Sequence, residues 1–306
     1  MSNIHGILLV VAAMAGFTIE DLLIKQLTET LPVGQLLMML GVASAVIFAL
    51  LSRLRGHSVF ARAAWRPVFL VRALAEAAAA LSFVTALSLV DISVVAAVFQ
   101  ATPLVITMGA ALFLGEQVGW RRWSAIGLGF LGVLVIIRPG FSGFEPAVLF
   151  VLITVAAIAA RDLVTRRMDV SVPSMVIAFQ GFAVLVPAGA VLLALGPAPA
   201  QGLTGMQPWM MLGAVATGAA SYYCIVHAMR IADASSVMPF RYTRLLFSLI
   251  AGVLVFGERP DALTLGGATL IMATGLYTFL REQRLARRAR RADALASGPG
   301  RASFRR

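Results

Sequence analysis

Long apolar runs, separated by short polar or glycine- and proline-containing breaks, make up most of this chain. The runs lie at roughly 4–26, 32–52, 67–89, 93–114, 121–138, 146–167, 172–195, 208–230, 235–257 and 263–281. A helix needs about 20 mainly apolar residues to cross the hydrocarbon core of a bilayer, and it satisfies its own backbone hydrogen bonds there. The pattern predicts an all-α membrane protein with ten transmembrane helices.

The composition agrees with lipid as the solvent. Hydrophobic residues make up 60% of the chain and charged residues 13%, against about 25% charged residues in an ordinary soluble domain. The formal charge of +11 does not indicate nucleic acid, because the basic residues lie between apolar runs and in the tail. The one cysteine, Cys224, excludes an intrachain disulfide. The first run lacks the basic leader and the small-residue cleavage site of a signal peptide, so we do not expect it to be cleaved.

The basic residues fall mainly on one side when the runs are threaded alternately through a membrane. With the N-terminus inside, the inner side receives the basic loops at 53–66, 121–122 and 166–167, together with Arg230 and the tail. The outer side receives Lys25, Arg138 and Arg259. Because Lys and Arg are enriched in cytoplasmic loops, the sequence predicts a multi-pass protein with both termini in the cytoplasm.

Two stretches 142 residues apart share one pattern, DISVVAAVFQATPLVITMGAALFLGE at 91–116 and DASSVMPFRYTRLLFSLIAGVLVFGE at 233–258. The earlier helices also align, since residues 20–25 match residues 161–166 at an offset of 141. Five predicted spans per half is an odd number, so the two five-helix repeats are inverted in the membrane. Inverted repeats are typical of alternating-access transporters with a substrate site near the midplane. The alternative is a repeat kept only for packing.

Several motifs in these repeats resemble the drug/metabolite transporter superfamily, in the branch with two EamA-type five-helix repeats. They are Asp91-Ile92-Ser93, Thr102-Pro103-Leu104, Leu114-Gly115-Glu116, Gly129-x-x-Gly132-Val133 and Ile137-Arg138-Pro139-Gly140 in the first half, and Ala232-Asp233-Ala234-Ser235 and Phe256-Gly257-Glu258 in the second. The resemblance covers about residues 4–281. It agrees with a first EamA-like repeat at 1–140, a second at 141–281 and a basic cytoplasmic tail at 282–306.

The resemblance implies a secondary transporter or facilitator of the bacterial inner (plasma) membrane. Similar proteins include exporters of amino acids and other metabolites, and importers such as those for S-adenosylmethionine. One departure is Leu245, which stands where the first half has Pro103. Any kink that depends on this proline is therefore expected to be asymmetric.

A Gly-Glu pair closes each of the two related stretches. Gly115 and Gly257 suit the left-handed conformation that follows a helix. Glu116 and Glu258 then precede the next predicted helix, where the positive end of the helix dipole favours an anion. We interpret both pairs as structural.

Six charged side chains fall inside the predicted spans, where an ionisable group is expensive unless it is paired or hydrated. They are Arg72, Glu76, Arg161, Asp162, Arg241 and Arg244. At about 1.5 Å per residue, all six lie in the inner half of the bundle and can form one cluster.

Two interpretations of this cluster stand side by side. In one, ion pairs lock the helices together or form an inner gate, with Arg72, Arg161 and Asp162 as its members. In the other, surplus arginine binds a carboxylate or phosphate of the substrate, through Arg241 and Arg244 beside Glu76. Asp21, the repeat partner of Asp162, lies near the outer end and is a candidate for an outer gate.

Aromatic and polar residues occupy the central depth of the same spans. Gln100 aligns with Tyr242 across the repeat, and Phe83, Phe99 and Tyr222 lie on neighbouring spans. A cavity with aromatic walls and a few polar groups is typical of small-molecule sites. These five residues are therefore predicted to line the substrate site, although any single ring can instead face lipid or the core.

Enzyme chemistry has little support. The sequence has no Walker-type phosphate loop and no His/Cys spacing for a metal, so we expect neither enzyme activity nor a cofactor. A channel would require a ring of like charges or carbonyls, which the mixed charges do not suggest.

The predicted function is export of amino acids or related small metabolites by alternating access through a central cavity. The alternatives are uptake of another metabolite such as S-adenosylmethionine, and an ion channel.

The expected partners are a small-molecule substrate and the lipid bilayer. The arginine-rich tail suits the anionic inner leaflet, although its simpler role is to set the topology. Nothing in the sequence indicates nucleic acid, and a monomer is the working expectation.

Overall fold

The computed structural model describes residues 2–140, 144–168, 172–232 and 237–296, and within them the regular secondary structure is helical, joined by turns and loops. Nine segments of these residues are long and apolar enough to cross a membrane. The helix α10 (Gln207–Ile231) has 25 residues and packs along α1. It corresponds to the remaining predicted segment. Asp233, Ala234 and Ser235 of the repeated motif lie outside the described residues.

The predicted runs correspond to the observed helices, with a short break or a change of helix type inside some of them. The first half contains α1 (Ser2–Thr28), α2 (Val33–Leu54), η1 (Arg62–Trp65), α3 (Pro67–Leu89), α4 (Ile92–Phe99), α5 (Thr102–Leu114) and α6 (Trp120–Ile137). The second contains η2 (Pro146–Val148), α7 (Leu149–Arg166), α8 (Ser174–Ala183), α9 (Leu185–Leu195), α10, η3 (Met238–Tyr242), α12 (Thr243–Phe256) and α13 (Ala262–Ala296). The predicted basic tail begins as a helix, because α13 continues to Ala296.

The break after Phe99 corresponds to a change of helix type at the equivalent position of the second repeat. In the first half α4 ends at Phe99 and α5 begins at Thr102, with Pro103 in its first turn. In the second half η3 ends at Tyr242 and α12 begins at Thr243. No residue separates η3 from α12, so the second half, with Leu245 in place of the proline, has a change from 3-10 to α-helix and not an interruption. Interrupted membrane helices often border binding sites, because their ends expose backbone groups.

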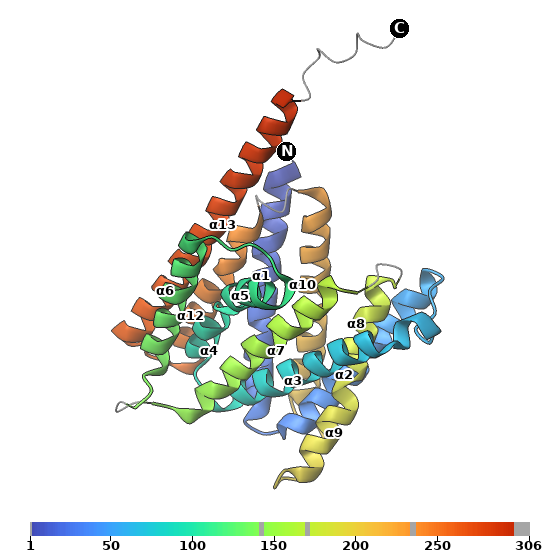
Figure 1. Cartoon of the computed structure of the whole chain (residues 1–306). Helices are drawn as coiled ribbons and strands as arrows, with labels where there is room; N and C mark the ends of the chain where they lie inside the picture. The colour runs from blue at the N-terminus through green and yellow to red at the C-terminus, as the bar shows by residue number, and fades with distance from the viewer. Residues whose placement is uncertain (1, 141–143, 169–171, 233–236, 297–306) are drawn as a thin grey trace.

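The strongest helix contacts join one helix of each repeat. They pair α1 with α10, α3 with α7, α6 with α13, and α2 with α8 and α9. At two of these crossings glycine allows the backbones to meet: a Cβ on Gly132 of α6 would lie 2.9 Å from the Gly267 carbonyl of α13, and one on Gly34 of α2 would lie 2.5 Å from the Gly189 carbonyl of α9. Small residues at such crossings are how membrane helices pack closely. Figure 1 shows α6 and α13 together at one edge of the bundle.

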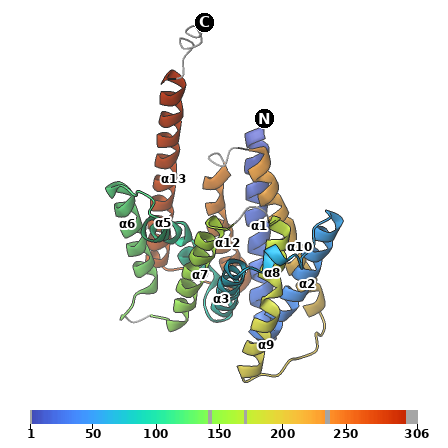
Figure 2. The ribbon, with the colours of Figure 1, turned by 45° about the vertical axis from the view of Figure 1, so that its right-hand side comes forward.

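The two described ends of the chain lie on the same side of the bundle. Figure 2 shows α13 extending beyond the other helices on the side where α1 begins. We call this side the terminal face, and the opposite side, which holds the turns after α1, α3, α6, α9 and α12, the far face. Many leucines on the outer helix faces are exposed, including Leu54, Leu195 and Leu254, as expected for helices that contact lipid.

The Gly-Glu pairs behave differently from one another. Gly115 and Gly257 both cap their helices in the left-handed conformation, with φ of 71° and 66°, which confirms the predicted caps. The Glu258 carboxylate, however, does not serve the helix that follows it. It accepts hydrogen bonds from the backbone N–H groups of Ile92 (2.7 Å) and Ser93 (3.0 Å) and from the Ser93 hydroxyl (2.6 Å), all at the start of α4. The local prediction was wrong for Glu258 because tertiary packing brings the N-terminus of α4 closer to it.

Candidate functional site

A small pocket lies between the two repeats, among α1, α3, α4 and α12. It is lined by Asp21, Phe83, Leu87, Ile92, Val95, Ala96, Phe99, Gln100 and Arg244. Gln100 reaches it because α4 stops at Phe99, and Arg244 reaches it because α12 begins one residue earlier, at Thr243. The break at Gln100 and the start of α12 thus supply two of its three polar side chains, and α1 supplies the third, Asp21.

Arg244 is the central group of this pocket. Its guanidinium Nη2 lies 2.7 Å from Oδ2 of Asp21, and the two side chains are 19% and 7% exposed. The guanidinium carbon also lies 5.3 Å from the ring centre of Phe17, 5.9 Å from that of Phe83 and 5.2 Å from that of Phe99. A cation held over aromatic faces away from water gains more than one at the surface. One arginine of the second repeat is therefore tied to a carboxylate and three rings of the first.

The pocket is tightly closed in this structure. Its cavity volume is about 10 Å³, which is close to the space that a single water molecule needs. The rings of Phe83 and Phe99 are in contact, with centres 5.4 Å apart. A metabolite can enter only if the helices around Arg244 move apart.

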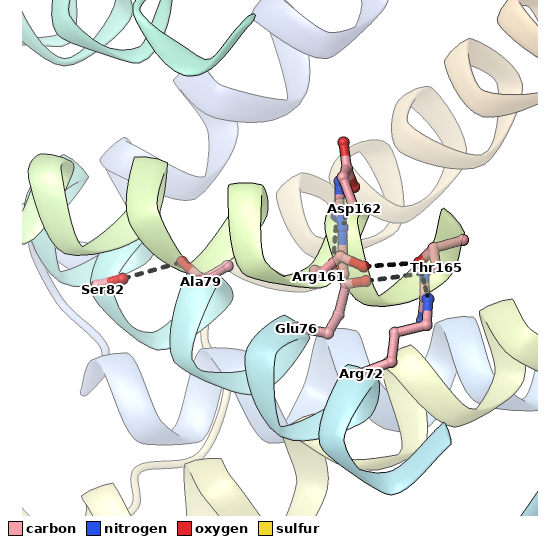
Figure 3. Close-up of polar contacts among 7 residues, drawn as sticks. All are labelled: Arg72, Glu76, Ala79, Ser82, Arg161, Asp162 and Thr165. Atoms are coloured by element: carbon pink, nitrogen blue, oxygen red, sulfur yellow. Dashed lines mark hydrogen bonds and ion pairs between the residues drawn. The ribbon is translucent and has the colours of Figure 1, made fainter. Parts of the chain in front are cut away.

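A second polar site links α3 to α7 nearer the terminal face. Nη1 of Arg161 lies 2.8 Å from Oε1 of Glu76, and Nη2 of Arg72 lies 3.3 Å from Oε2 of the same carboxylate. Arg161 also pairs with Asp162 at 2.8 Å, and Nε of Arg72 donates to the Thr165 hydroxyl at 3.1 Å. Figure 3 shows Glu76 between the two arginines, which belong to different helices. We call Arg72, Glu76, Arg161 and Asp162 the α3–α7 network.

The α3–α7 network is partly hydrated, because its side chains are between 14% and 37% exposed. Deeper in the bundle the same two helices meet through a hydrogen bond of 2.9 Å from the Thr154 hydroxyl to the Ser82 hydroxyl. Figure 3 shows Ser82 two turns along α3 from Glu76. The two helices are therefore held at two depths by polar contacts.

The remaining predicted site residues lie around these two sites. Arg241 is exposed, and it is within electrostatic range of Arg161, Asp162 and Arg244. Tyr222 packs edge-on against Phe48 with ring centres 5.6 Å apart. It also lies within electrostatic range of the charged side chains of the α3–α7 network.

Tyr242 turns away from the pocket. Its hydroxyl fills the space above Gly275 of α13, where a Cβ would lie 1.9 Å from the oxygen. The repeat symmetry that aligned Tyr242 with Gln100 does not extend to the direction of their side chains.

Polar contacts gather at the far face, some within the first repeat and some between the two repeats. Nζ of Lys25 donates to the carbonyls of Leu87 (3.1 Å) and Val90 (2.6 Å) at the end of α3, which is where a cation complements the helix dipole. Glu258 caps α4 beside it. Asp91 precedes α4 without capping it. Burial and the nearby Glu258 raise the pKa of the Asp91 carboxyl, while Lys25 opposes them.

Comparison with known proteins identifies the fold's family. The EamA-like transporter family matches the chain twice, over residues 4–138 and 145–280. The chain belongs to the EamA-like transporter family. It is accordingly a multi-pass membrane transporter, and the recognition made from the Asp-x-Ser and Gly-Glu motifs is confirmed.

Three relatives differ in what their names say they carry. A riboflavin transporter of Rhizobium johnstonii is 32% identical over 225 residues, which is 73% of each chain. An S-adenosylmethionine uptake transporter of Rickettsia felis is 25% identical over 205 residues, covering 66% of this chain and 68% of the relative. A pseudopaline exporter of Pseudomonas aeruginosa is 24% identical over 269 residues, covering 87% and 93%. Export of amino acids is thus not confirmed by these names.

The predicted residues of this EamA protein fall into two sites instead of one cluster. Asp21, Phe83, Phe99, Gln100 and Arg244 line the central pocket. The α3–α7 network holds the other charges, with Arg241 and Tyr222 nearby. Arg244 leaves the predicted cluster because its long side chain pairs with Asp21 of α1.

Sequence reasoning missed Phe17 and the apolar wall of the pocket. Phe17 lies one helical turn before Asp21, and residues four apart share a helix face. That spacing was a usable signal. No local signal pointed to Ile92, Val95 and Ala96, because small apolar residues are common throughout the spans.

Proposed function

We propose that this protein moves a small, flat heterocyclic metabolite across the bacterial inner membrane, through the pocket around Arg244, with riboflavin as the first candidate. The single observation that carries the proposal is the position of Arg244 between Asp21 and three phenylalanine rings. Flat rings stack well on phenylalanine. The amide of Gln100 and the charged pair offer hydrogen bonds to the polar edges of such a ring.

The composition of the pocket also fits a carrier that alternates its access. Asp21 belongs to the first repeat and Arg244 to the second, so their ion pair spans the two units that would move. A substrate that takes over the hydrogen bonds of either partner weakens this tie. Binding and helix movement would then be coupled through one contact, as expected when ligand and conformation share free energy. The excess of basic residues in loops on the terminal face supports an orientation with that face in the cytoplasm.

The riboflavin transporter relative supports the choice of substrate class, since it is more similar in sequence than the two others reported. Export of an amino acid or an amino-acid-derived metabolite is the second candidate. It is favoured by the relative named as a pseudopaline exporter and by Arg241 and Arg244, which suit a carboxylate. Asp21 neutralises Arg244, however, so the arginine excess that motivated this candidate is smaller than the sequence suggested.

The test is transport by the purified protein in liposomes. Labelled riboflavin, S-adenosylmethionine and a panel of amino acids are offered separately, and exchange against unlabelled compound inside is measured. Exchange of riboflavin that unlabelled flavins compete supports the proposal. Exchange of amino acids without exchange of riboflavin would replace it with the second candidate, and large unitary currents in electrical recordings would favour a channel over either.

A further inference from the structure

One charged residue in the membrane-spanning part has not been used so far. Glu20 lies on α1, next to Asp21 and eight residues before the end of the helix at Thr28. At about 1.5 Å per residue, it lies about 12 Å from the far-face end of α1. An ionisable group at such a depth usually has a functional reason.

The repeat relationship shows what is unusual about Glu20. At the offset of 141, Glu20 corresponds to Arg161, and at the offset of 142, Glu76 corresponds to Gly218. The α3–α7 pair carries the Arg161–Glu76 bridge. The equivalent α1–α10 pair carries Glu20 opposite Gly218, where a Cβ would lie 2.5 Å from Oε1 of Glu20. The carboxylate thus occupies a space that a glycine leaves open, without the cation that the other pair has.

Glu20 points into the protein and not into lipid. It lies seven residues after Ala13 and seven before Leu27, which share its face of α1 and are 0% and 1% exposed. The adjacent Ile19, about 100° around the helix, is 46% exposed. Ser221 of α10 packs on the same interface, against Gly16.

Among the described residues, the Glu20 carboxylate has neither a hydrogen bond nor an ion pair. The charged groups that act on it are Asp21 on its own helix and Arg244 of α12. Arg244 is engaged with Asp21 at 2.7 Å. From α10, Gly218 packs on the carboxylate and Ser221 lies along the same interface. The 3-10 helix η3 also packs on α1 and carries Arg241, whose charge interacts with Arg244, Asp162 and Arg161 and not with Glu20.

Two neighbouring carboxylates of α1 therefore lie within electrostatic range of one guanidinium, which pairs with Asp21 alone. An ionised carboxylate without a partner is unfavourable in an apolar setting, and such a group takes up a proton instead. When a substrate draws Arg244 away from Asp21, the guanidinium becomes available to the neighbouring carboxyl, and the proton can leave.

We infer that Glu20 binds and releases a proton, and that it couples transport through the Arg244 pocket to the proton gradient. The chemical change is limited to the O–H bond of the Glu20 carboxyl. Its proton passes to water on whichever face is open, and the electron pair stays on the carboxylate. The coupling rests on the proposed transport function, whereas proton binding by Glu20 does not.

A direct test of proton binding needs no substrate. The full-length protein in liposomes is treated with dicyclohexylcarbodiimide, a membrane-soluble reagent that modifies protonated carboxyls, at pH values from about 5 to 9, and modified peptides are measured by mass spectrometry. We expect modification of Glu20 that falls by about tenfold per pH unit once the carboxyl is mostly ionised. Glu76, which is held by two arginines, is expected to stay unmodified throughout.

Absence of modification at Glu20 across this range would overturn the inference. So would modification that is independent of pH, because it would show a carboxyl that never releases its proton. The Glu20→Gln variant identifies the peptide signal. Since these outcomes do not depend on the substrate, they remain decisive even if the protein carries none of the compounds in the panel.

Coupling is tested with whichever compound the wild-type protein exchanges. In Glu20→Gln, accumulation driven by an imposed pH gradient is expected to fall at least about tenfold relative to exchange without a gradient. Glu29→Gln is the matched control, because Glu29 is exposed in the turn after α1. An unchanged ratio of accumulation to exchange in Glu20→Gln would limit Glu20 to proton binding without coupling and overturn that half of the inference.

Discussion

Replacing Arg244 by leucine tests the central pocket most directly. Leucine keeps an apolar side chain against Phe17, Phe83 and Phe99 but removes the guanidinium that lies 5.2 to 5.9 Å from their ring centres. It also removes the 2.7 Å ion pair with Asp21. The packing is thus largely preserved while the charge is lost.

The expected magnitude follows from the burial of this pair. Asp21 is 5% exposed, and removing one partner of a buried ion pair costs about 3–5 kcal/mol. If about 3 kcal/mol of this is lost from the transport-competent state, the rate constant for transport at low substrate falls about 100-fold, since about 1.4 kcal/mol corresponds to a factor of ten. We therefore expect Arg244→Leu to reduce kcat/KM for transport by about two orders of magnitude.

A loss of folding must be separated from a loss of function. The double variant Asp21→Asn/Arg244→Leu removes both charges, so no unpaired carboxylate remains at this position. Its thermal stability in detergent, measured by fluorescence-detected size-exclusion chromatography after heating, is expected to recover most of what Arg244→Leu loses. Its transport rate is expected to stay low, because the guanidinium is still absent.

The assay is the initial rate of exchange in proteoliposomes over a range of substrate concentrations, normalised to the amount of folded protein. Arg53→Leu is the matched control, because Arg53 is exposed at the end of α2. A rate for Arg244→Leu within about threefold of the wild type, at normal stability, would refute a role for Arg244 in transport. Recovery of transport in the double variant would instead assign the pair a structural role.

Three further predictions concern the contacts between the repeats. Glu258→Gln removes the negative charge from a cap with three hydrogen bonds of 2.6 to 3.0 Å. We expect a loss of about 1–3 kcal/mol in stability, measured as a lower thermal midpoint. An unchanged midpoint would mean that the charge contributes nothing. Arg161→Met leaves Glu76 with Arg72 alone. Because the side chains of Arg161 and Glu76 are 24% exposed, we expect a smaller loss of stability, about 1 kcal/mol or less, in the same assay. A loss larger than that of Glu258→Gln would contradict this ranking. Hydrogen bonds from Arg138 and the Thr264 N–H lower the pKa of Asp261 from 3.8 to about 2. The ionised carboxylate therefore stabilises the fold above about pH 4, and this contribution is lost as the pH falls toward 2; Asp261→Asn should reduce the slope of the thermal midpoint in that window, and an identical slope would exclude the contribution.

The hydrophobic pattern was sufficient to predict the transmembrane segments, the duplication and the family. The break at Gln100 was also visible, because Pro103 follows it within the same run. The change of helix type at Tyr242 was not, since the second repeat has Leu245 in place of that proline. The asymmetry expected from Pro103 and Leu245 therefore takes the form of a break in one half and a change of helix type in the other.

The sequence predicted most residues of the candidate site but not which of them contact one another. Asp21 was expected to serve an outer gate and Arg244 to join the inner cluster, yet they bind each other. The arginine stem is long and flexible, so the depth of its Cα does not determine where its charge lies. The Arg72–Glu76 contact was predictable, because both residues lie on one helix four positions apart.

The sequence by itself determined which segments lie in the membrane and that two halves run in opposite directions, because both depend on hydropathy, charge and spacing along the chain. Tertiary structure alone decided which side chains meet across the repeats. The rotation of each helix about its axis turned Tyr242 toward Gly275 while Gln100 entered the pocket. Helix packing likewise brought Glu258 to the start of α4 and left Glu20 opposite Gly218. The last two contacts join residues more than 150 positions apart, where no local pattern can specify the distance between two side chains.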